Sequence, residues 1–200
     1  MKAVILCGGE GTRMRPLSYS RPKHLISVAN RPVLDWIIDD LSRAGVDRIA
    51  VIASPSTERR CRAFCAERTC DGRELTIIVQ EEAKGIAHAV LCAEEFVAGD
   101  SFLLYLGDNL FEHGVEKLVE LFLAEHPSAA IALKKVDDPR RFGVARLEDG
   151  SSSWWRSLRF RPARLLLLAR TSSQRPYSMR RCGSSHPSKG NSRSLTRSNG

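Results

Sequence analysis

The sequence predicts an α/β fold, a doubly wound and mostly parallel sheet of the Rossmann-like kind, and three observations support this prediction. Short runs rich in β-forming apolar residues recur along 2–133, and the run at 101–106 is almost entirely apolar. Segments with apolar residues at helical spacing lie between these runs. Because strand and helix alternate regularly, the strands are expected to run parallel, with helices covering both faces of the sheet.

Each element has a local reason in the sequence. Pro32 suits the first turn of a helix whose apolar residues recur at helical spacing, and Gly45 suits its end. The next predicted helix is polar, and the last is amphipathic. Strands are predicted at 2–6, 48–53, 75–79, 101–106 and 129–133, and helices at 33–41, 57–67, 86–96 and 115–124.

A glycine-rich loop follows the first predicted strand directly. Gly8, Gly9 and Gly11 can let several backbone N–H groups converge on one anion, and Arg13, Arg15 and Lys23 add positive charge. The expected ligand is a phosphate chain. The loop lacks the Gly-Lys-Ser/Thr of a Walker A motif and the third glycine of a dinucleotide fingerprint, so both of these common motifs are excluded.

The composition shows where the basic charge lies, and it argues against a cysteine metal site and against a membrane span. Eleven of the 31 basic residues and none of the 23 acidic ones lie in 151–200, so the whole basic excess belongs to the tail. The six cysteines are scattered without a paired CxxC, which favours reduced thiols over a metal site. No apolar run is long enough to cross a membrane, so a cytoplasmic protein without membrane association is expected.

The loop motif resembles the signature of the sugar-1-phosphate nucleotidyltransferases. It reads G-G-x-G-T-R-x-R-P and is followed by P-K. Further landmarks resemble the glucose-1-phosphate thymidylyltransferases in the same order over residues 1–150: Gln80 with Lys84 to Ala89, Leu106 to Asn109, and Asp138 to Val144. The resemblance implies transfer of a nucleotidyl group from dTTP to glucose 1-phosphate, which yields dTDP-glucose and pyrophosphate by in-line attack on the α-phosphate.

The resemblance also implies a role for individual residues. The loop would hold the triphosphate, Arg13 would stabilise the departing phosphates, Lys23 would hold the α-phosphate, and Asp108 would bind Mg²⁺. Gln80 and Gly85 would recognise the base, and Gly143 would lie in the sugar site. His88 is expected to pack within its helix rather than to act in catalysis. The nucleotide-binding set is Leu6, Gly8, Gly9, Gly11, Thr12, Arg13, Lys23, Gln80 and Gly85, and the catalytic set is Arg13, Lys23 and Asp108.

The resemblance stops near Gly150, where the chain becomes rich in serine and arginine. With suitable codons and an offset of one base, 189–199 (KGNSRSLTRSN) becomes KGELEITDAIK, 154–158 becomes VVEKP and 165–171 becomes LALVGAY, all similar to the family. Residues 1–150 are therefore interpreted as the nucleotide-binding part, and 151–200 as an out-of-frame tail. This tail is expected to be largely disordered and to lack the missing strands, so activity is expected to be impaired.

Alternative functions follow from the same features. The base could be uracil, or the chain could be an inactive remnant that binds nucleotide without turnover. A third hypothesis is nucleic-acid binding through the tail, where Trp154 and Trp155 lie among arginines, but basic tails bind nucleic acid without specificity. No specific nucleic-acid partner is therefore expected, whereas a homo-oligomer is possible in intact relatives.

Overall fold

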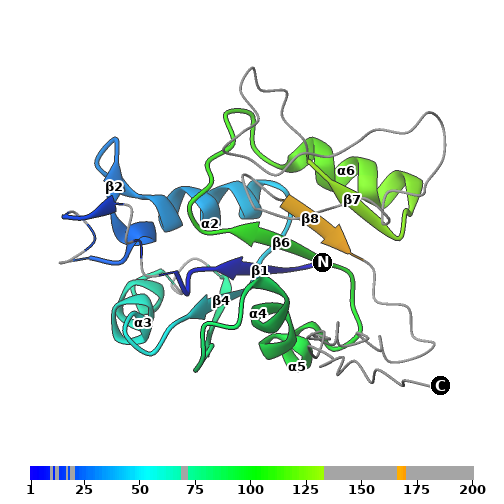
Figure 1. Cartoon of the computed structure of the whole chain (residues 1–200). Helices are drawn as coiled ribbons and strands as arrows, with labels where there is room; N and C mark the ends of the chain where they lie inside the picture. The colour runs from blue at the N-terminus through cyan, green and yellow to red at the C-terminus, as the bar shows by residue number, and fades with distance from the viewer. Residues whose placement is uncertain are drawn as a thin grey trace, which may run out of the picture.

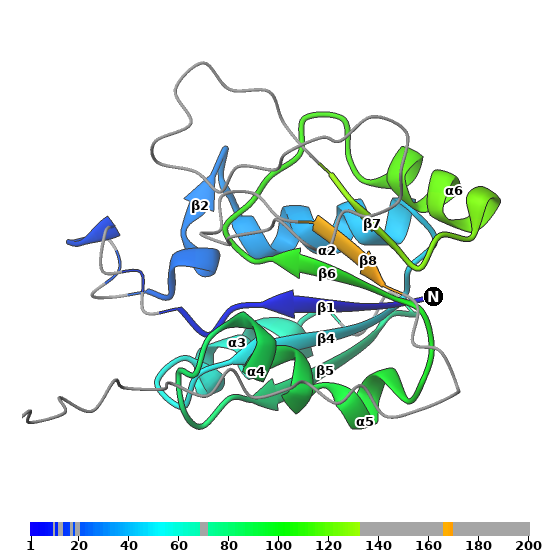
Figure 2. The ribbon, with the colours of Figure 1, turned by 45° about the vertical axis from the view of Figure 1, so that its right-hand side comes forward.

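The fold was established from a computed structural model of the chain. The structure describes residues 1–9, 11, 14–16, 18, 21–68, 72–132 and 166–169, the last of these as backbone only. Within these ranges the protein is an α/β fold with a central, mostly parallel sheet between two layers of helices (Figures 1 and 2). The predicted fold class is confirmed.

The main sheet has six strands in the order β5-β4-β1-β6-β8-β7. The strands are β1 (Lys2–Leu6), β4 (Arg48–Ala53), β5 (Glu74–Val79), β6 (Phe102–Leu106), β7 (Ala129–Ile131) and β8 (Leu166–Ala169). β1 lies between β4 and β6 and pairs in parallel with both. Since β4 also pairs in parallel with β5, four neighbouring strands end at the same edge of the sheet.

The first strand alternates between two hydrophobic cores. Ala3 and Ile5 face a core shared with α2 (Val33–Arg43), α3 (Glu58–Ala66) and α6 (Glu116–Glu125). Val4 faces a second core with α4 (Ile86–Cys92) and α5 (Glu94–Val97). Successive side chains of a strand point to opposite faces, so the apolar first strand requires cover on both sides.

Two local features differ from the predictions. The single helix expected at 86–96 is two helices, because the amide of Ala93 bonds to the carbonyl of Val90, 3.0 Å away, in a tighter turn. Before α2, the chain forms the 3₁₀-helix η2 (Lys23–Leu25) and a small hairpin of β2 (Ser27–Val28) and β3 (Arg31–Pro32). Ala29 and Asn30 have positive φ values at its turn.

The tail contributes one strand, contrary to the expectation that it supplies none. β8 pairs antiparallel with β6 on one side and with β7 on the other, so β7 does not touch β6 directly. The segment contains consecutive leucines, and its backbone pairs with an edge of β6 whose amide and carbonyl groups would otherwise lack strand partners. The sheet is thus parallel from β5 to β6 and mixed beyond it.

Candidate nucleotide-binding site

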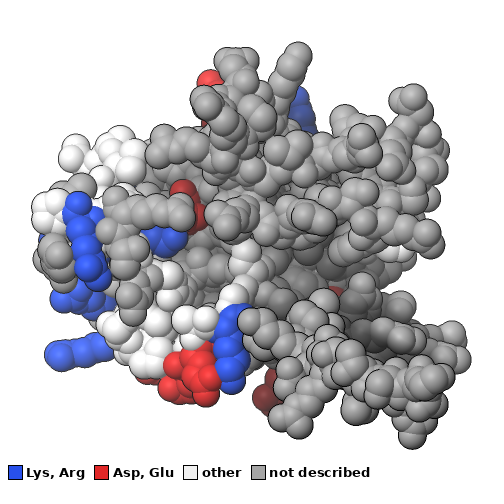
Figure 3. All heavy atoms as spheres, in the orientation of Figure 1, with Lys and Arg blue, Asp and Glu red and all other residues white. Residues whose placement is uncertain are grey.

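The glycine loop leaves the carboxyl end of β1 in the middle of the sheet. The amide of Cys7 still donates to the carbonyl of Ile52, 2.8 Å away, so the chain departs from β4 only at Gly8. Gly11 has a φ of 63°, in the left-handed region where a side chain is strained. In Figure 3, basic side chains gather at the edge toward which β1 and β6 point in Figure 1.

Lys23 lies across this loop. It begins η2 directly after Pro22, and a Cβ built on Gly9 would lie 3.4 Å from its Nζ. The same ammonium donates to Asp108 Oδ2 at 2.5 Å. The Lys23 side chain is only 19 % exposed, whereas that of Asp108 is 47 % exposed. One cation therefore contacts both the glycine loop and the carboxylate beyond β6.

Gly107 brings the end of β6 against the end of β1. Its amide donates to the carbonyl of Leu6 at 3.0 Å. A Cβ at this position would lie 2.7 Å from both Leu6 O and Cys7 Sγ, which is closer than real Cβ atoms approach. Only glycine fits, and this close approach places Asp108 beside the loop. Gly107 belongs to the Leu106–Asn109 landmark, but the sequence alone shows no reason for a glycine there, because Leu6 and Cys7 are distant in the chain.

Gln80 directly follows β5, and its backbone is hydrogen-bonded to the last residue of β4. The backbone N–H of Gln80 donates to Ala53 O at 2.8 Å. The residue is nearly buried, with 9 % of its surface exposed. Its Nε2 lies 3.2 Å from Gly85 O and 3.0 Å from His88 Nδ1. Its Oε1 lies 3.3 Å from where a Cβ on Gly8 would be.

The structure thus brings together most of the predicted site residues that it describes. The loop glycines, Lys23, Asp108 and Gln80 converge beyond the carboxyl ends of parallel strands, where open α/β sheets bind ligands. Thr12, Arg13 and Gly143 lie outside the described residues. His88, expected only to pack in its helix, also contacts Gln80; its position at the start of a helix, three residues after Gly85, was the available signal.

The described residues contain no cluster of three or more His, Cys, Asp or Glu side chains able to hold a metal ion. Asp108 is a single carboxylate on a half-exposed side chain. It fits a Mg²⁺ ion that takes its other ligands from phosphate oxygens and water, which is how magnesium commonly binds beside a nucleotide. A metal held by protein side chains alone does not fit this part of the chain.

A buried histidine lies directly behind Lys23. Burial, and then the neighbouring Lys23 ammonium, lower the pKa of His24 to about 4. Its Nε2 lies 3.6 Å from Cys61 Sγ. Burial also raises the pKa of the Cys61 thiol to about 11 and that of Cys65 to about 12. His24, Cys61 and Cys65 are therefore neutral at pH 7, so the positive charge beside them is that of Lys23.

Comparisons with known proteins agree with this geometry. A family model described as nucleotidyl transferase matches residues 2–160. The chain is 42 % identical over 149 residues to the low-salt glycan biosynthesis nucleotidyltransferase Agl11 of Haloferax volcanii, and 39 % identical over 150 residues to a glucose-1-phosphate thymidylyltransferase of Streptomyces antibioticus. Each match covers 74 % of this chain and 42 % of the relative, so the chain spans less than half the length of these proteins.

Another curated relative is named for its use of UTP. The UTP–glucose-1-phosphate uridylyltransferase AglF of Haloferax volcanii is 33 % identical over 151 residues, with 74 % of this chain and 61 % of AglF covered. A solved structure from Bacillus anthracis, assigned as a glucose-1-phosphate thymidylyltransferase, matches with a TM-score of 0.74 and 29 % identity, covering 86 % of this chain and 72 % of that one. From the loop, the sheet and these matches together, the chain belongs to the nucleotidyl transferase family.

Proposed function

We propose that the protein is a sugar-1-phosphate nucleotidyltransferase that uses dTTP and glucose 1-phosphate. The observation that carries this proposal is the convergence of the glycine loop, the Lys23–Asp108 pair and Gln80 at one sheet edge. The phosphate oxygen of the sugar would attack the α-phosphorus, a new O–P bond would form, and the bond to the β-phosphate would break to release pyrophosphate. Positioning and charge neutralisation dominate such phosphoryl chemistry.

Individual residues have distinct tasks in this proposal. The N–H groups of the glycine loop bind the triphosphate, and Lys23, placed between that loop and Asp108, holds the α-phosphate. Arg13 stabilises the charge that develops on the departing phosphates. Asp108 binds Mg²⁺, which when bound neutralises phosphate charge. Gly143 contributes to the sugar site.

A uridylyltransferase is the second candidate, because the site geometry suits either base and one curated relative is named for its use of UTP. Gln80 directs an amide oxygen toward the loop, and thymine and uracil both carry the ring N–H that such an oxygen accepts. AglF, a UTP-dependent relative, is 33 % identical. A chain that holds dTTP without turnover is the third possibility, because the Ser/Arg-rich segment from about residue 151 does not resemble the sugar-binding half of the family. Among the described residues, no helix is long and apolar enough to cross a membrane.

The tail forms part of this proposal. We infer that residues from about 151 arise from an out-of-frame reading, because matches to the curated relatives extend over 147 to 151 residues. The family model itself reaches residue 160. Resequencing the gene around codon 150 tests this inference, and an intact frame that encodes the Ser/Arg-rich tail would refute it.

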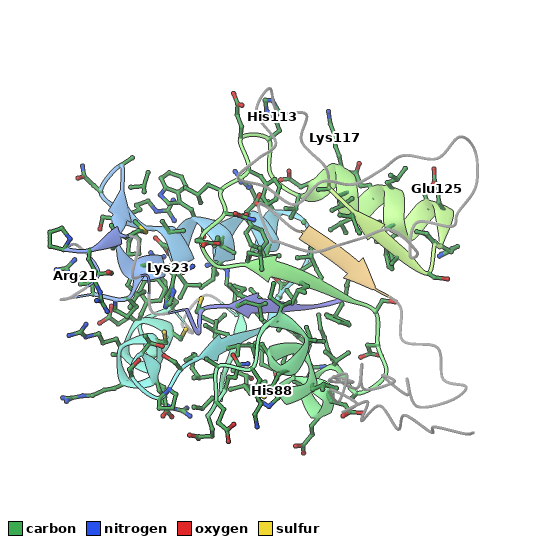
Figure 4. All side chains as sticks on the ribbon, viewed as in Figure 1. Arg21, Lys23, His88, His113, Lys117 and Glu125 are labelled. Carbon is green, nitrogen blue, oxygen red and sulfur yellow. The ribbon has the colours of Figure 1, made fainter. Side chains whose placement is uncertain are left out.

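Calorimetry with dTTP and Mg²⁺ tests the binding part of the proposal. Lys23→Met should weaken dTTP binding about 10-fold to 100-fold, because it removes a charge-assisted contact with phosphate. Lys117→Met is the matched control, since Lys117 is exposed on α6 and lies well away from Lys23 in Figure 4. Equal affinities for wild type and Lys23→Met would contradict the site.

Pyrophosphate release tests turnover. With Mg²⁺ and glucose 1-phosphate, release that depends on dTTP supports the first candidate, and release that depends on UTP supports the second. Tight nucleotide binding without release identifies the chain as a remnant. A chain that binds neither nucleotide refutes the proposal as a whole.

A further inference from the structure

The orientation of the Gln80 amide is decided by its neighbours. The carbonyl oxygen of Gly85 can only accept a hydrogen bond, so the Gln80 atom 3.2 Å from it must be the amide nitrogen. The reversed amide would place two oxygens against each other. Gly85 O also accepts the first helical hydrogen bond of α4, from the amide of Ala89 at 3.1 Å, so this carbonyl is fixed by the helix.

His88 uses the second hydrogen of the same nitrogen. The Nδ1 atom of His88 lies 3.0 Å from Gln80 Nε2. Because the amide nitrogen of Gln80 can only donate, the Nδ1 atom of His88 must accept this hydrogen bond. The imidazole is therefore neutral and carries its proton on Nε2. Both partners belong to the first turn of α4, Gly85 as its N-cap residue and His88 on its first turn (Figure 4). The turn thus holds the nitrogen of Gln80 from two sides.

The amide oxygen is left to face the glycine loop. Gln80 Oε1 lies 3.3 Å from where a Cβ on Gly8 would be, so the absent side chain leaves room beside it. The side-chain hydrogen bonds of Gln80 among the described residues both use Nε2. The group that Gln80 offers a ligand is thus a pure acceptor. Uracil and thymine have a ring N–H at N3 that fits this acceptor, whereas cytosine has a lone pair there.

We propose that His88 is a positioning residue that sets base selectivity: by accepting from Gln80 Nε2 it keeps the amide oxygen toward Gly8, so that the site selects uracil and thymine over cytosine. This inference rests on the proposed function, because it takes the site to bind a pyrimidine nucleoside triphosphate. His88 acts through Gln80, without itself touching the base. The same arrangement does not separate thymine from uracil, which are identical at N3.

The first test observes the imidazole directly in the full 200-residue chain. Multiple-bond ¹H–¹⁵N NMR spectra of the chain labelled with ¹⁵N-histidine distinguish protonated from unprotonated ring nitrogens. We expect an unprotonated Nδ1 and a protonated Nε2 for His88 at pH 7.5, assigned by its loss in His88→Leu. A protonated Nδ1 would overturn the inference whatever the protein binds.

The second test measures selectivity between UTP and CTP, which differ only at the base edge that Gln80 would read. Calorimetric affinities are compared for wild type, His88→Leu, His88→Asn and the exposed control His113→Leu. In His88→Leu one amide hydrogen loses its acceptor, so the preference for UTP over CTP should fall about fivefold to tenfold. His88→Asn, whose Oδ1 can occupy the place of Nδ1, should recover most of it, and His113→Leu should retain all of it.

The outcomes separate the two proposals. Equal losses for UTP and CTP in His88→Leu would indicate a purely structural role and would overturn the inference, and so would an unchanged ratio. Failure of His88→Asn to recover selectivity in a folded protein, judged by its circular dichroism spectrum, would also overturn it. A wild-type chain that binds neither nucleotide would overturn the proposed function and this inference with it.

Discussion

Replacement of Gly107 by alanine tests the contact that holds the two halves of the site together. A Cβ at position 107 would lie 2.7 Å from Leu6 O and 3.3 Å from Leu6 C, and both are backbone atoms of the central strand. They cannot rotate away as the end of a side chain could. The ends of β1 and β6 must therefore separate, and the hydrogen bond from Gly107 N to Leu6 O, 3.0 Å long, is strained or lost.

The magnitude follows from these two effects. Overpacking of a well-packed interior costs about 1–3 kcal/mol, and a backbone hydrogen bond contributes about 1 kcal/mol. We therefore expect Gly107→Ala to lower the free energy of unfolding by about 2–4 kcal/mol, at the upper end of ordinary substitutions. Binding of the nucleoside triphosphate should weaken as well, since Asp108 follows Gly107 directly.

Urea unfolding followed by far-ultraviolet circular dichroism measures this change. Gly9→Ala is the matched control, because its Cβ would meet only the flexible end of Lys23 at 3.4 Å, and its stability should stay within about 0.5 kcal/mol of wild type. If Gly107→Ala changed stability by no more than Gly9→Ala, the close approach of β1 and β6 would be refuted.

The other predictions concern protonation, thiol access and the tail. The pKa of His24 falls from an ordinary 6.5 to about 4 in the folded protein, so the unfolded chain binds more protons between these values, and stability should drop by about 3 kcal/mol as pH falls from 6.5 to 4. Urea unfolding across this range should show the drop in wild type and not in His24→Met, and parallel curves would contradict it. Three cysteines are buried and have raised thiol pKa values, Cys7, Cys61 and Cys65, so a thiol reagent should label them only after unfolding. The partly exposed Cys92 should react in the native protein. Mass spectrometry of each labelled site measures this difference, and labelling of Cys61 in the native protein would contradict the packing. Truncation after Gly150 removes β8 from between β6 and β7, so the amides of β6 that face it should exchange with solvent at least about tenfold faster; unchanged exchange rates would show that β8 does not pair there.

The sequence by itself determined the alternation of strands and helices over the first 132 residues. Apolar periodicity is a local property, so the strands at 2–6 and 48–53 and the helix begun by Pro32 could be located from neighbouring residues alone. The glycine loop, Gln80 and Asp108 were also identifiable, because each follows a strand in a recognisable pattern, and Lys23 was identifiable because it follows Pro22 in the P-K motif. The roles of Thr12, Arg13 and Gly143 stay predictions.

Tertiary structure decided the features that depend on residues distant in the chain. The pairing of β8 with β6 joins segments about sixty residues apart, and no local pattern specifies which open edge an apolar run will occupy. Gly107 is required only because Leu6 and Cys7 lie against it. The contact of His88 with Gln80 likewise depends on how the first turn of α4 packs over the end of β5. These are matters of contact, which a pattern of apolar and polar residues does not encode.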